Sequence, residues 1–204
     1  MSSNLPTVIL DLGGVYFSDG TARAINIISD KYSLDRQNVA DIFRKEVGKM
    51  YRENKLTMEE FWREAKKKWH IEESTDKLAQ IWHEGYIPVE DVKKIVIQLK
   101  TKGVEVLYLS GSTQERVRYL EEKYHFLQYF DDGVFTFNVR VRKPDSIPYQ
   151  CILKKAKNYS GDCIFVDNSP EYLVPARELG MKTILYTNPN DLRKNLVKLG
   201  FWFL

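Results

Sequence analysis

The chain has 204 residues, of which 43% are hydrophobic and 29% charged, with a formal net charge of +3. This length suits one domain, or a core with a smaller insertion, and the composition is ordinary for a soluble globular protein. No apolar run approaches the length of a membrane span, and the basic residues are scattered among acidic ones, which argues against a membrane protein and against a nucleic-acid-binding surface.

The first predicted element is a strand over residues 8–12, whose apolar run leads into Asp11 and is followed by Gly13 and Gly14. Ligands of open α/β sheets bind at the carboxyl ends of parallel strands, and glycines at such a turn let a ligand approach the backbone closely. An aspartate in this place can act as a covalent nucleophile or bind a hard cation. No second carboxylate stands two residues later, so the expected general acid is absent.

Residues 19–88 carry helical patterns with no convincing strand between them. One apolar stripe covers residues 39–50, and a second helix begins at a capping box in which Thr57 and Glu60 satisfy free backbone amides. The buried stripe of that second helix is formed by Phe61, Trp62, Ala65 and Trp69. Because this segment directly follows the first strand, we expect a helical cap over residues 19–88, above the carboxyl ends of the sheet.

From residue 89 onward, predicted helices and strands alternate. The apolar spacing predicts helices over 89–99, 113–124, 145–157, 170–179 and 191–199, and strands over 104–109, 163–166 and 182–186. This alternation implies a parallel sheet with helices on both faces. We therefore predict an α/β core formed by residues 1–18 and 89–204, interrupted by the helical cap.

Polar side chains stand at four strand ends or helix starts of this core. The Ser110 hydroxyl and the Gly111 amide precede a helix and can hold an anion there, and Lys143 can neutralise a carboxylate and a phosphate oxygen together. Asp167 ends a second strand and is expected to lie close to Asp11, where two like charges require a cation between them. Oxygen ligands of this kind favour Mg²⁺.

This order of acid, hydroxyl, lysine and acid resembles the four motifs of the haloacid dehalogenase-like (HAD) superfamily, in the group with a small helical cap inserted after the first motif. The resemblance covers essentially the whole chain, with motifs at residues 11–15, 110, 143–145 and 167–168. It implies a Rossmann-like core and an aspartyl-enzyme intermediate. In most members, it also implies Mg²⁺-dependent hydrolysis of phosphomonoesters.

The resemblance also implies roles for individual residues. Asp11 would attack phosphorus, Ser110 and the Gly111 amide would hold the transferring phosphoryl group, and Lys143 would balance its charge. The implied Mg²⁺ ligands are Asp11, the Gly13 backbone carbonyl, Asp167 and Asn168.

Three positions depart from the family pattern. Gly13 replaces the aspartate that protonates the leaving oxygen, Gly111 stands where asparagine is common, and Asn168 stands where a second carboxylate is common. General acid catalysis is worth about 10²–10⁴-fold, so the loss at position 13 matters most.

Without that acid, the enzyme could act on a phosphate with an acidic leaving group, such as a sugar 1-phosphate or an acyl phosphate. Alternatively, water or a nearby side chain supplies the proton. The nearest candidate donors in the sequence are Tyr16, Ser18 and Asp19.

We predict a phosphoric monoester hydrolase that acts on a small phosphorylated metabolite through an aspartyl-phosphate at Asp11. A metal-independent haloacid dehalogenase is one alternative, because halide needs no acid in order to leave. A catalytically weak or inactive phosphate-binding protein is the other alternative, since Gly111 and Asn168 depart from the pattern. The sequence predicts neither the substrate nor the oligomeric state.

The N-terminal residues lack the charged and apolar regions of a signal peptide, and Cys151 and Cys163 are too few for a disulfide framework. We therefore expect a cytoplasmic protein. The densest basic cluster, at residues 66–68, is interpreted as a solvated helix face rather than a nucleic-acid site.

Overall fold

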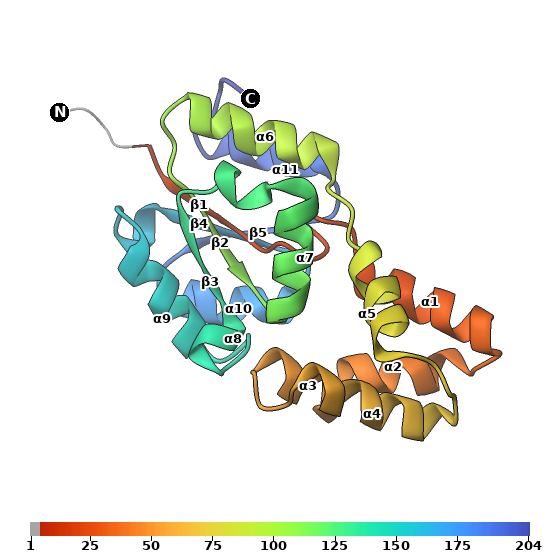
Figure 1. The fold of residues 1–204 in the computed structure, drawn as a ribbon. Coiled ribbons are helices and arrows are strands. Elements are labelled where there is room, and N and C mark those ends of the chain that lie inside the picture. Colours follow the sequence, from red (N-terminus) through yellow and green to blue (C-terminus); the bar gives the residue numbers. More distant parts are fainter. Residues whose placement is uncertain (1–4) are drawn as a thin grey trace.

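The computed structural model describes residues 5–204. The prediction about a signal peptide concerns in part residues 1–4, which lie outside the described residues. Five parallel strands form one sheet in the order β3-β2-β1-β4-β5 (Figure 1). The strands are β1 (Thr7–Leu10), β2 (Val106–Ser110), β3 (Asp132–Phe135), β4 (Cys163–Asp167) and β5 (Lys182–Leu185). Strand β1 is therefore central, and the carboxyl ends of β2 and β4 flank its own.

Helices cover both faces of the sheet, which confirms the predicted α/β class. One face packs against α6 (Glu90–Thr101), α7 (Gln114–Tyr124) and α11 (Pro189–Lys198). The other face packs against α9 (Ser146–Lys155) and α10 (Pro170–Glu178). Alternate side chains of β1 pack on opposite faces of the sheet. Val8 belongs to the hydrophobic cluster on the face of α6, and Ile9 to the cluster on the face of α9. Burial on both faces explains why the strands are almost continuously apolar.

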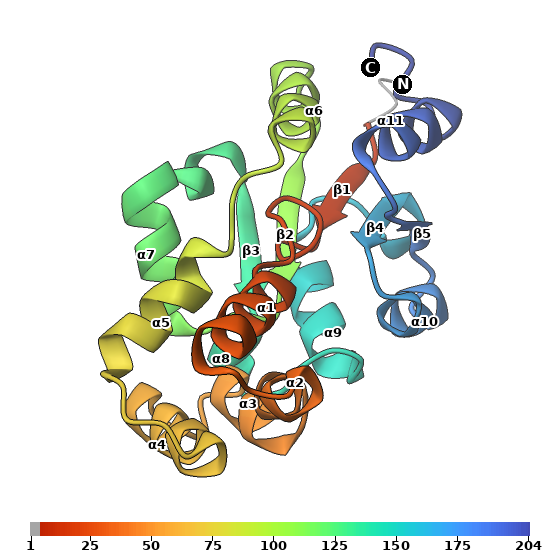
Figure 2. The same cartoon turned by 90° about the vertical axis from the view of Figure 1, so that its right-hand side faces the viewer.

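Five further helices form a helical layer beyond the carboxyl end of β1, within residues 19–88 (Figure 2). They are α1 (Gly20–Tyr32), α2 (Arg36–Arg44), α3 (Glu46–Arg52), α4 (Met58–Trp69) and α5 (Thr75–Glu84). The layer has its own aromatic centre, in which the rings of Phe43, Phe61 and Trp82 lie within 6 Å of one another. The predicted capping box at Thr57 and the buried stripe of α4 are confirmed.

The prediction of one apolar stripe over residues 39–50 is wrong, because the chain forms two helices there. Lys45 is extended and separates α2 from α3. Gly48 allows the close packing of the two helices, since a Cβ at this position would lie 2.1 Å from the Phe43 carbonyl oxygen.

The structure also contains elements that the apolar spacing does not predict. They are strand β3, the short helix α8 (Thr136–Val139) and the 3₁₀ helices η1 (Phe126–Tyr129) and η2 (Ser160–Asp162). Strand β3 begins with Asp132 and Gly133, a pair that is typical of turns, so its pattern resembles a loop.

Two chain segments connect the helical layer to the core, and they run side by side. The Ser18 hydroxyl donates to the Gly85 carbonyl and accepts from the Ile87 amide, at 2.8 and 3.0 Å. The Val89 amide donates to the Tyr16 carbonyl at 2.8 Å. These bonds fix the layer next to the strand ends. Within the described residues, every helix is too short or too polar to cross a membrane.

Candidate active site

The polar residues at the predicted strand ends meet at one edge of the sheet. The Asp11 amide donates to the Val166 carbonyl at 2.9 Å, which holds the residue after β1 beside the end of β4. Asp167 is the last residue of β4, and Ser110 is the last residue of β2, on the opposite side of β1. The parallel register therefore brings these segments together.

Lys143 joins the two carboxylates. Its Nζ lies 3.0 Å from Asp11 Oδ1 and 2.5 Å from Asp167 Oδ2, and it also donates to the Leu109 carbonyl at 3.2 Å. All three charged residues are buried: 7% of Asp11, 4% of Lys143 and none of Asp167 is exposed. The second Asp167 oxygen accepts the Ser169 amide at 2.9 Å, so both of its oxygens are engaged by protein groups.

The Lys143 ammonium lies between the two carboxylates and supplies part of the positive charge that their closeness requires. One positive charge against two negative ones leaves the cluster negative. The cation expected from the sequence is therefore met in part by Lys143, and Mg²⁺ beside Asp11 stays a prediction.

Burial and charge shift the protonation of this cluster. Burial, with a further contribution from Asp167, raises the pKa of Asp11 from 3.8 to about 6, although Lys143 opposes the shift. Burial would lower the pKa of Lys143, but the two carboxylates outweigh it and raise that pKa above its ordinary value. Lys143 is consequently charged at neutral pH, and Asp11 is ionised above about pH 6.

A cavity of about 550 Å³ lies above this cluster, between the strand ends and the helical layer. Its lining includes five of the predicted site residues, namely Asp11, Gly13, Gly111, Lys143 and Asn168. Asp167 does not line the cavity, because it lies behind Lys143. Ser110 lies beside it, on a small void of about 20 Å³ that Gly111 also lines. The structure thus brings the predicted residues together, with Asp167 and Ser110 set back from the main cavity.

The oxygen donors around Asp11 are chemically suited to Mg²⁺. The backbone bonds of the loop, from Gly14 to Phe17 and from Phe17 to Leu12, do not use the Gly13 carbonyl. Asn168 lies against Gly14, where a Cβ would be 2.4 Å from Asn168 Nδ2 and φ is +86°, so this contact requires glycine. No group of three His, Cys, Asp or Glu side chains gathers as a metal site within residues 5–204. Mg²⁺ commonly binds through one or two carboxylates together with water and substrate phosphate, which this donor set allows.

The space beside Gly13 is taken by an aromatic side chain. A Cβ at Gly13 would lie 3.2 Å from Cε1 of Tyr86, in the segment between α5 and α6. The Tyr86 hydroxyl is hydrogen-bonded to Thr21 Oγ1 at 2.8 Å and accepts from Arg116 Nη1 at 3.1 Å. The ring therefore occupies the side of the loop where a residue-13 carboxylate would project.

Of the three proton donors suggested by the sequence, Asp19 alone lines the cavity. Its side chain also accepts the Ala22 amide as the N-cap of α1. Tyr16 is buried among Phe17 and Phe130, and Ser18 is used by the connecting segments. The structure therefore removes Tyr16 and Ser18 as donors to a leaving group.

Among the residues near the cavity that have no counterpart in the sequence analysis are Arg52, Tyr86 and Arg116. Tyr86 and Arg52 line the main cavity, and Arg116 lines the small void beside Ser110. Their spacing matches no motif, and an arginine on an amphipathic helix ordinarily indicates a solvated face. Only the packing of the helical layer on the core reveals them.

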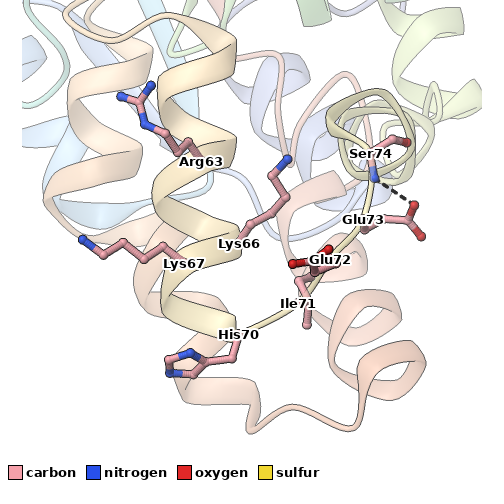
Figure 3. Close-up of a pocket in the computed structure, with 8 residues that line it drawn as sticks. All are labelled: Arg63, Lys66, Lys67, His70, Ile71, Glu72, Glu73 and Ser74. Atoms are coloured by element: carbon pink, nitrogen blue, oxygen red, sulfur yellow. Dashed lines mark hydrogen bonds between the residues drawn. The ribbon is translucent and has the colours of Figure 1, made fainter.

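A second groove, of about 770 Å³, lies on the helical layer between the end of α4 and the start of α5 (Figure 3). It shares no lining residue with the cavity at Asp11. Arg63 and Lys67 on its α4 side are exposed, as is Lys68 nearby. Lys66 is half-buried, so the exposure of Lys67 and Lys68 agrees only in part with a solvated helix face, and that interpretation of residues 66–68 stays a prediction.

Comparison with known families matches residues 20–186 to the family described as haloacid dehalogenase-like hydrolase. A relative from Dictyostelium discoideum, named as an uncharacterized protein, is 30% identical over 158 residues, covering 76% of this chain and 68% of the relative.

Among solved structures, a HAD family enzyme from Bacteroides thetaiotaomicron, in complex with magnesium and inorganic phosphate, has a TM-score of 0.73 at 17% identity, covering 90% of this chain and 95% of that chain. The L-2-haloacid dehalogenase of Xanthobacter autotrophicus, with chloropropionic acid covalently bound, has a TM-score of 0.65 at 15% identity, covering 97% and 84%. At these identities, the likeness to the two structures concerns the fold.

Proposed function

Since the chain belongs to the haloacid dehalogenase-like hydrolase family, we propose that it is a Mg²⁺-dependent phosphatase that acts on a small phosphorylated metabolite. One observation carries this proposal: the Asp11 carboxylate lies at the end of the central strand, beside the cavity, with Lys143 Nζ 3.0 Å from its Oδ1. The ammonium engages one carboxylate oxygen, so the second oxygen is the one that would attack an incoming phosphoryl group.

In the proposed reaction, an Asp11 oxygen attacks phosphorus and forms an aspartyl-phosphate, while the bond from phosphorus to the ester oxygen breaks. The Gly111 amide and the Ser110 hydroxyl hold the phosphoryl oxygens, and Lys143 neutralises their charge. The leaving oxygen takes a proton from water as it departs. Water then attacks the aspartyl-phosphate, which releases inorganic phosphate and restores Asp11.

Asp11, the Gly13 carbonyl and Asn168 are the groups that would hold Mg²⁺. When bound, the ion supplies charge neutralisation to the phosphoryl oxygens. Asp167 would act through Lys143, because both of its oxygens are already engaged. The HAD family enzyme with magnesium and phosphate in its structure supports this assignment by analogy of fold.

The helical layer within residues 19–88 would serve as the cap of this active site. It contributes Arg44 and Arg52 to the cavity wall, and Tyr86 from the returning segment. A cap in this place would exclude water and contact the part of the substrate beyond the phosphoryl group.

The test of the proposed function is metal-dependent phosphate release. Purified protein with Mg²⁺ should release phosphate from members of a panel of small phosphorylated metabolites. EDTA should lower the rate by about 10²-fold or more, because the phosphoryl charge then loses its main counter-ion. Excess Mg²⁺ should restore the rate. The absence of phosphate release from every member of a broad panel would end the proposal.

The absence of an acid at position 13 can be tested by measuring how kcat/KM depends on the leaving group, in the native protein and in the variant Gly13→Asp. Without a general acid, the native rate should depend steeply on the leaving group, with p-nitrophenyl phosphate cleaved far faster than glycerol 3-phosphate. The new carboxylate requires the Tyr86 ring to shift by a few tenths of an ångström, because a Cβ there lies 3.2 Å from it. Gly13→Asp should then raise kcat/KM about 10–100-fold for the alkyl ester and little for the aryl ester.

The control for this measurement is Gly13→Asn, which adds similar bulk without a proton to donate. It should leave the leaving-group dependence as steep as in the native protein. Phosphatase activity that is present in Gly13→Asp alone, for every ester, would instead show that the native chain is a phosphate-binding protein without turnover.

A haloacid dehalogenase is the second candidate, favoured by one observation. Lys143 directly engages Asp11, so that carboxylate has a counter-ion of its own and could attack carbon without a metal ion. The likeness to the Xanthobacter autotrophicus dehalogenase is consistent with this chemistry. Release of halide from a 2-haloacid in the presence of EDTA would support it.

A further inference from the structure

The wall of the cavity carries arginine side chains without acidic partners. Arg44 and Arg52 come from the helical layer, and Arg142 directly precedes Lys143. Within residues 5–204, the one arginine that pairs with an Asp or Glu side chain is Arg36, which meets Asp30 on the exposed surface of the layer. The three cavity arginines therefore have no counter-ion among the described side chains.

Arg52 is held in place although its charge is not neutralised. Its Nη1 donates to the Phe43 carbonyl at 2.6 Å and to the Gly48 carbonyl at 3.0 Å, and its guanidinium lies 5.4 Å from the ring centre of Trp82. Both hydrogen bonds use Nη1, so Nε and Nη2 have no acceptor among residues 5–204. A fixed guanidinium with free donors is well prepared to bind an anion.

A second guanidinium adds to the positive charge around Arg52. Arg116 is 2% exposed and lies 4.7 Å from the ring centre of Trp82, the same ring on which Arg52 packs. Its donors reach the Ser112 hydroxyl, the Tyr86 hydroxyl and the Gly111 carbonyl, all of them neutral groups. Burial and this neighbouring charge lower the pKa of Arg52 to about 10. A bound anion would relieve that repulsion.

The lining of the cavity has more cationic than acidic side chains. Arg44, Arg52, Arg142 and Lys143 face the three carboxylates of Asp11, Asp19 and Glu171. Asp11 is paired with Lys143, and neither Asp19 nor Glu171 forms an ion pair with an arginine among the described residues. The lining therefore carries a surplus of positive charge.

We propose that Arg52 and Arg142 bind a second anionic group of the substrate, a carboxylate or a second phosphate, while its phosphoryl group lies at Asp11. This inference rests on the proposed function and names the substrate class of the same site. The planar guanidinium can bind either anion through two parallel hydrogen bonds. A cavity of about 550 Å³ has room for a small metabolite with two charged ends.

The first test compares substrates that differ in the second anion alone. 2-Phosphoglycolate is compared with 2-hydroxyethyl phosphate for the carboxylate, and glucose 1,6-bisphosphate with glucose 1-phosphate for the second phosphate. In the native protein, the doubly anionic member of at least one pair should have a kcat/KM at least ten times higher. The pair that shows the preference identifies the anion.

The variants Arg52→Gln and Arg142→Gln should remove that preference by raising KM, with kcat changed less than threefold. Arg52→Gln also removes two hydrogen bonds to the backbone, whereas the Arg142 side chain forms no hydrogen bond or ion pair within residues 5–204. Arg142→Gln thus tests the charge without loss of packing. The matched control is Arg63→Gln, an exposed arginine in the separate groove of Figure 3, which should keep the native preference.

A binding measurement separates this inference from the proposed function. Calorimetry with 3-phosphonopropionate and propylphosphonate needs no turnover, and the native protein should bind the former at least ten times more tightly. Equal affinity for both probes, with no kinetic preference in either substrate pair, would overturn the inference. A preference that survives in both Arg52→Gln and Arg142→Gln would overturn it as well. A native protein that releases no phosphate but still binds 3-phosphonopropionate more tightly than propylphosphonate would contradict the proposed function alone.

Discussion

Asp11→Asn should abolish phosphate release and at the same time stabilise the fold at neutral pH. The amide cannot attack phosphorus, so kcat should fall by about 10⁴-fold or more. The folded-state pKa of Asp11 is about 6, against 3.8 in the ordinary state, so the folded protein binds more protons between these values. The ionised carboxylate therefore destabilises the fold above pH 6, and a neutral amide removes that penalty.

Two measurements check this result: the rate of phosphate release and the midpoint of thermal unfolding at pH 7. The midpoint should rise, because the buried charge of Asp11 is removed while Lys143 keeps its partner Asp167. The control is Asp145→Asn, at the N-cap of α9, where the side chain accepts the Ile147 amide and asparagine caps equally well. It should retain native activity. An Asp11→Asn protein that turns over at the native rate would rule out the covalent mechanism.

Lys143→Met should have the largest effect on stability. It leaves Asp11 and Asp167 buried side by side without the ammonium that lies 3.0 and 2.5 Å from them. Removal of one partner from a buried ion cluster typically costs about 3–5 kcal/mol. Activity should be lost as well, since the phosphoryl charge loses its neutralising group.

The loss of stability in Lys143→Met should grow as the pH rises. Without Lys143, the folded-state pKa of Asp11 rises further above 3.8, so the folded protein binds more protons than the unfolded chain over a wider range. The free energy of unfolding of Lys143→Met should therefore fall as pH rises from about 4 to 7. Urea unfolding at several pH values measures it.

The double variant Lys143→Met with Asp167→Asn serves as the control for Lys143→Met, because it leaves a single buried carboxylate. It should recover most of the lost stability. A Lys143→Met protein as stable as the native one at pH 7 would show that the carboxylates are not held together by this ammonium.

The convergence of the site could be predicted from the sequence because it depends on strand ends. Asp11 and Asp167 follow apolar runs, and parallel strands place their carboxyl ends at one edge of a sheet. The position of Lys143 between them could not be predicted, since no pattern encodes which way a lysine in a loop points. The expected cation between the acids is met in part by the Lys143 ammonium, and Mg²⁺ beside Asp11 stays a prediction.

The residues that form the wall of the cavity could not be predicted from the sequence, for a different reason. Arg52 and Arg116 belong to helices far apart in the chain, and they approach each other because both pack on Trp82. Tyr86 belongs to a segment between helices, and its contact with Gly13 follows from the return path of the chain. Local patterns carry no information about such contacts.

The central place of β1 in the sheet has a consequence for how the protein opens. Strands at the edges, β3 and β5, have one neighbour each, whereas β1 is hydrogen-bonded on both sides. Amide hydrogens of the edge strands are therefore the first to exchange with solvent during local fluctuations, and those of β1 are among the last. The Asp11 carboxylate directly follows the strand that opens least, so its position is kept when the edges of the sheet fray.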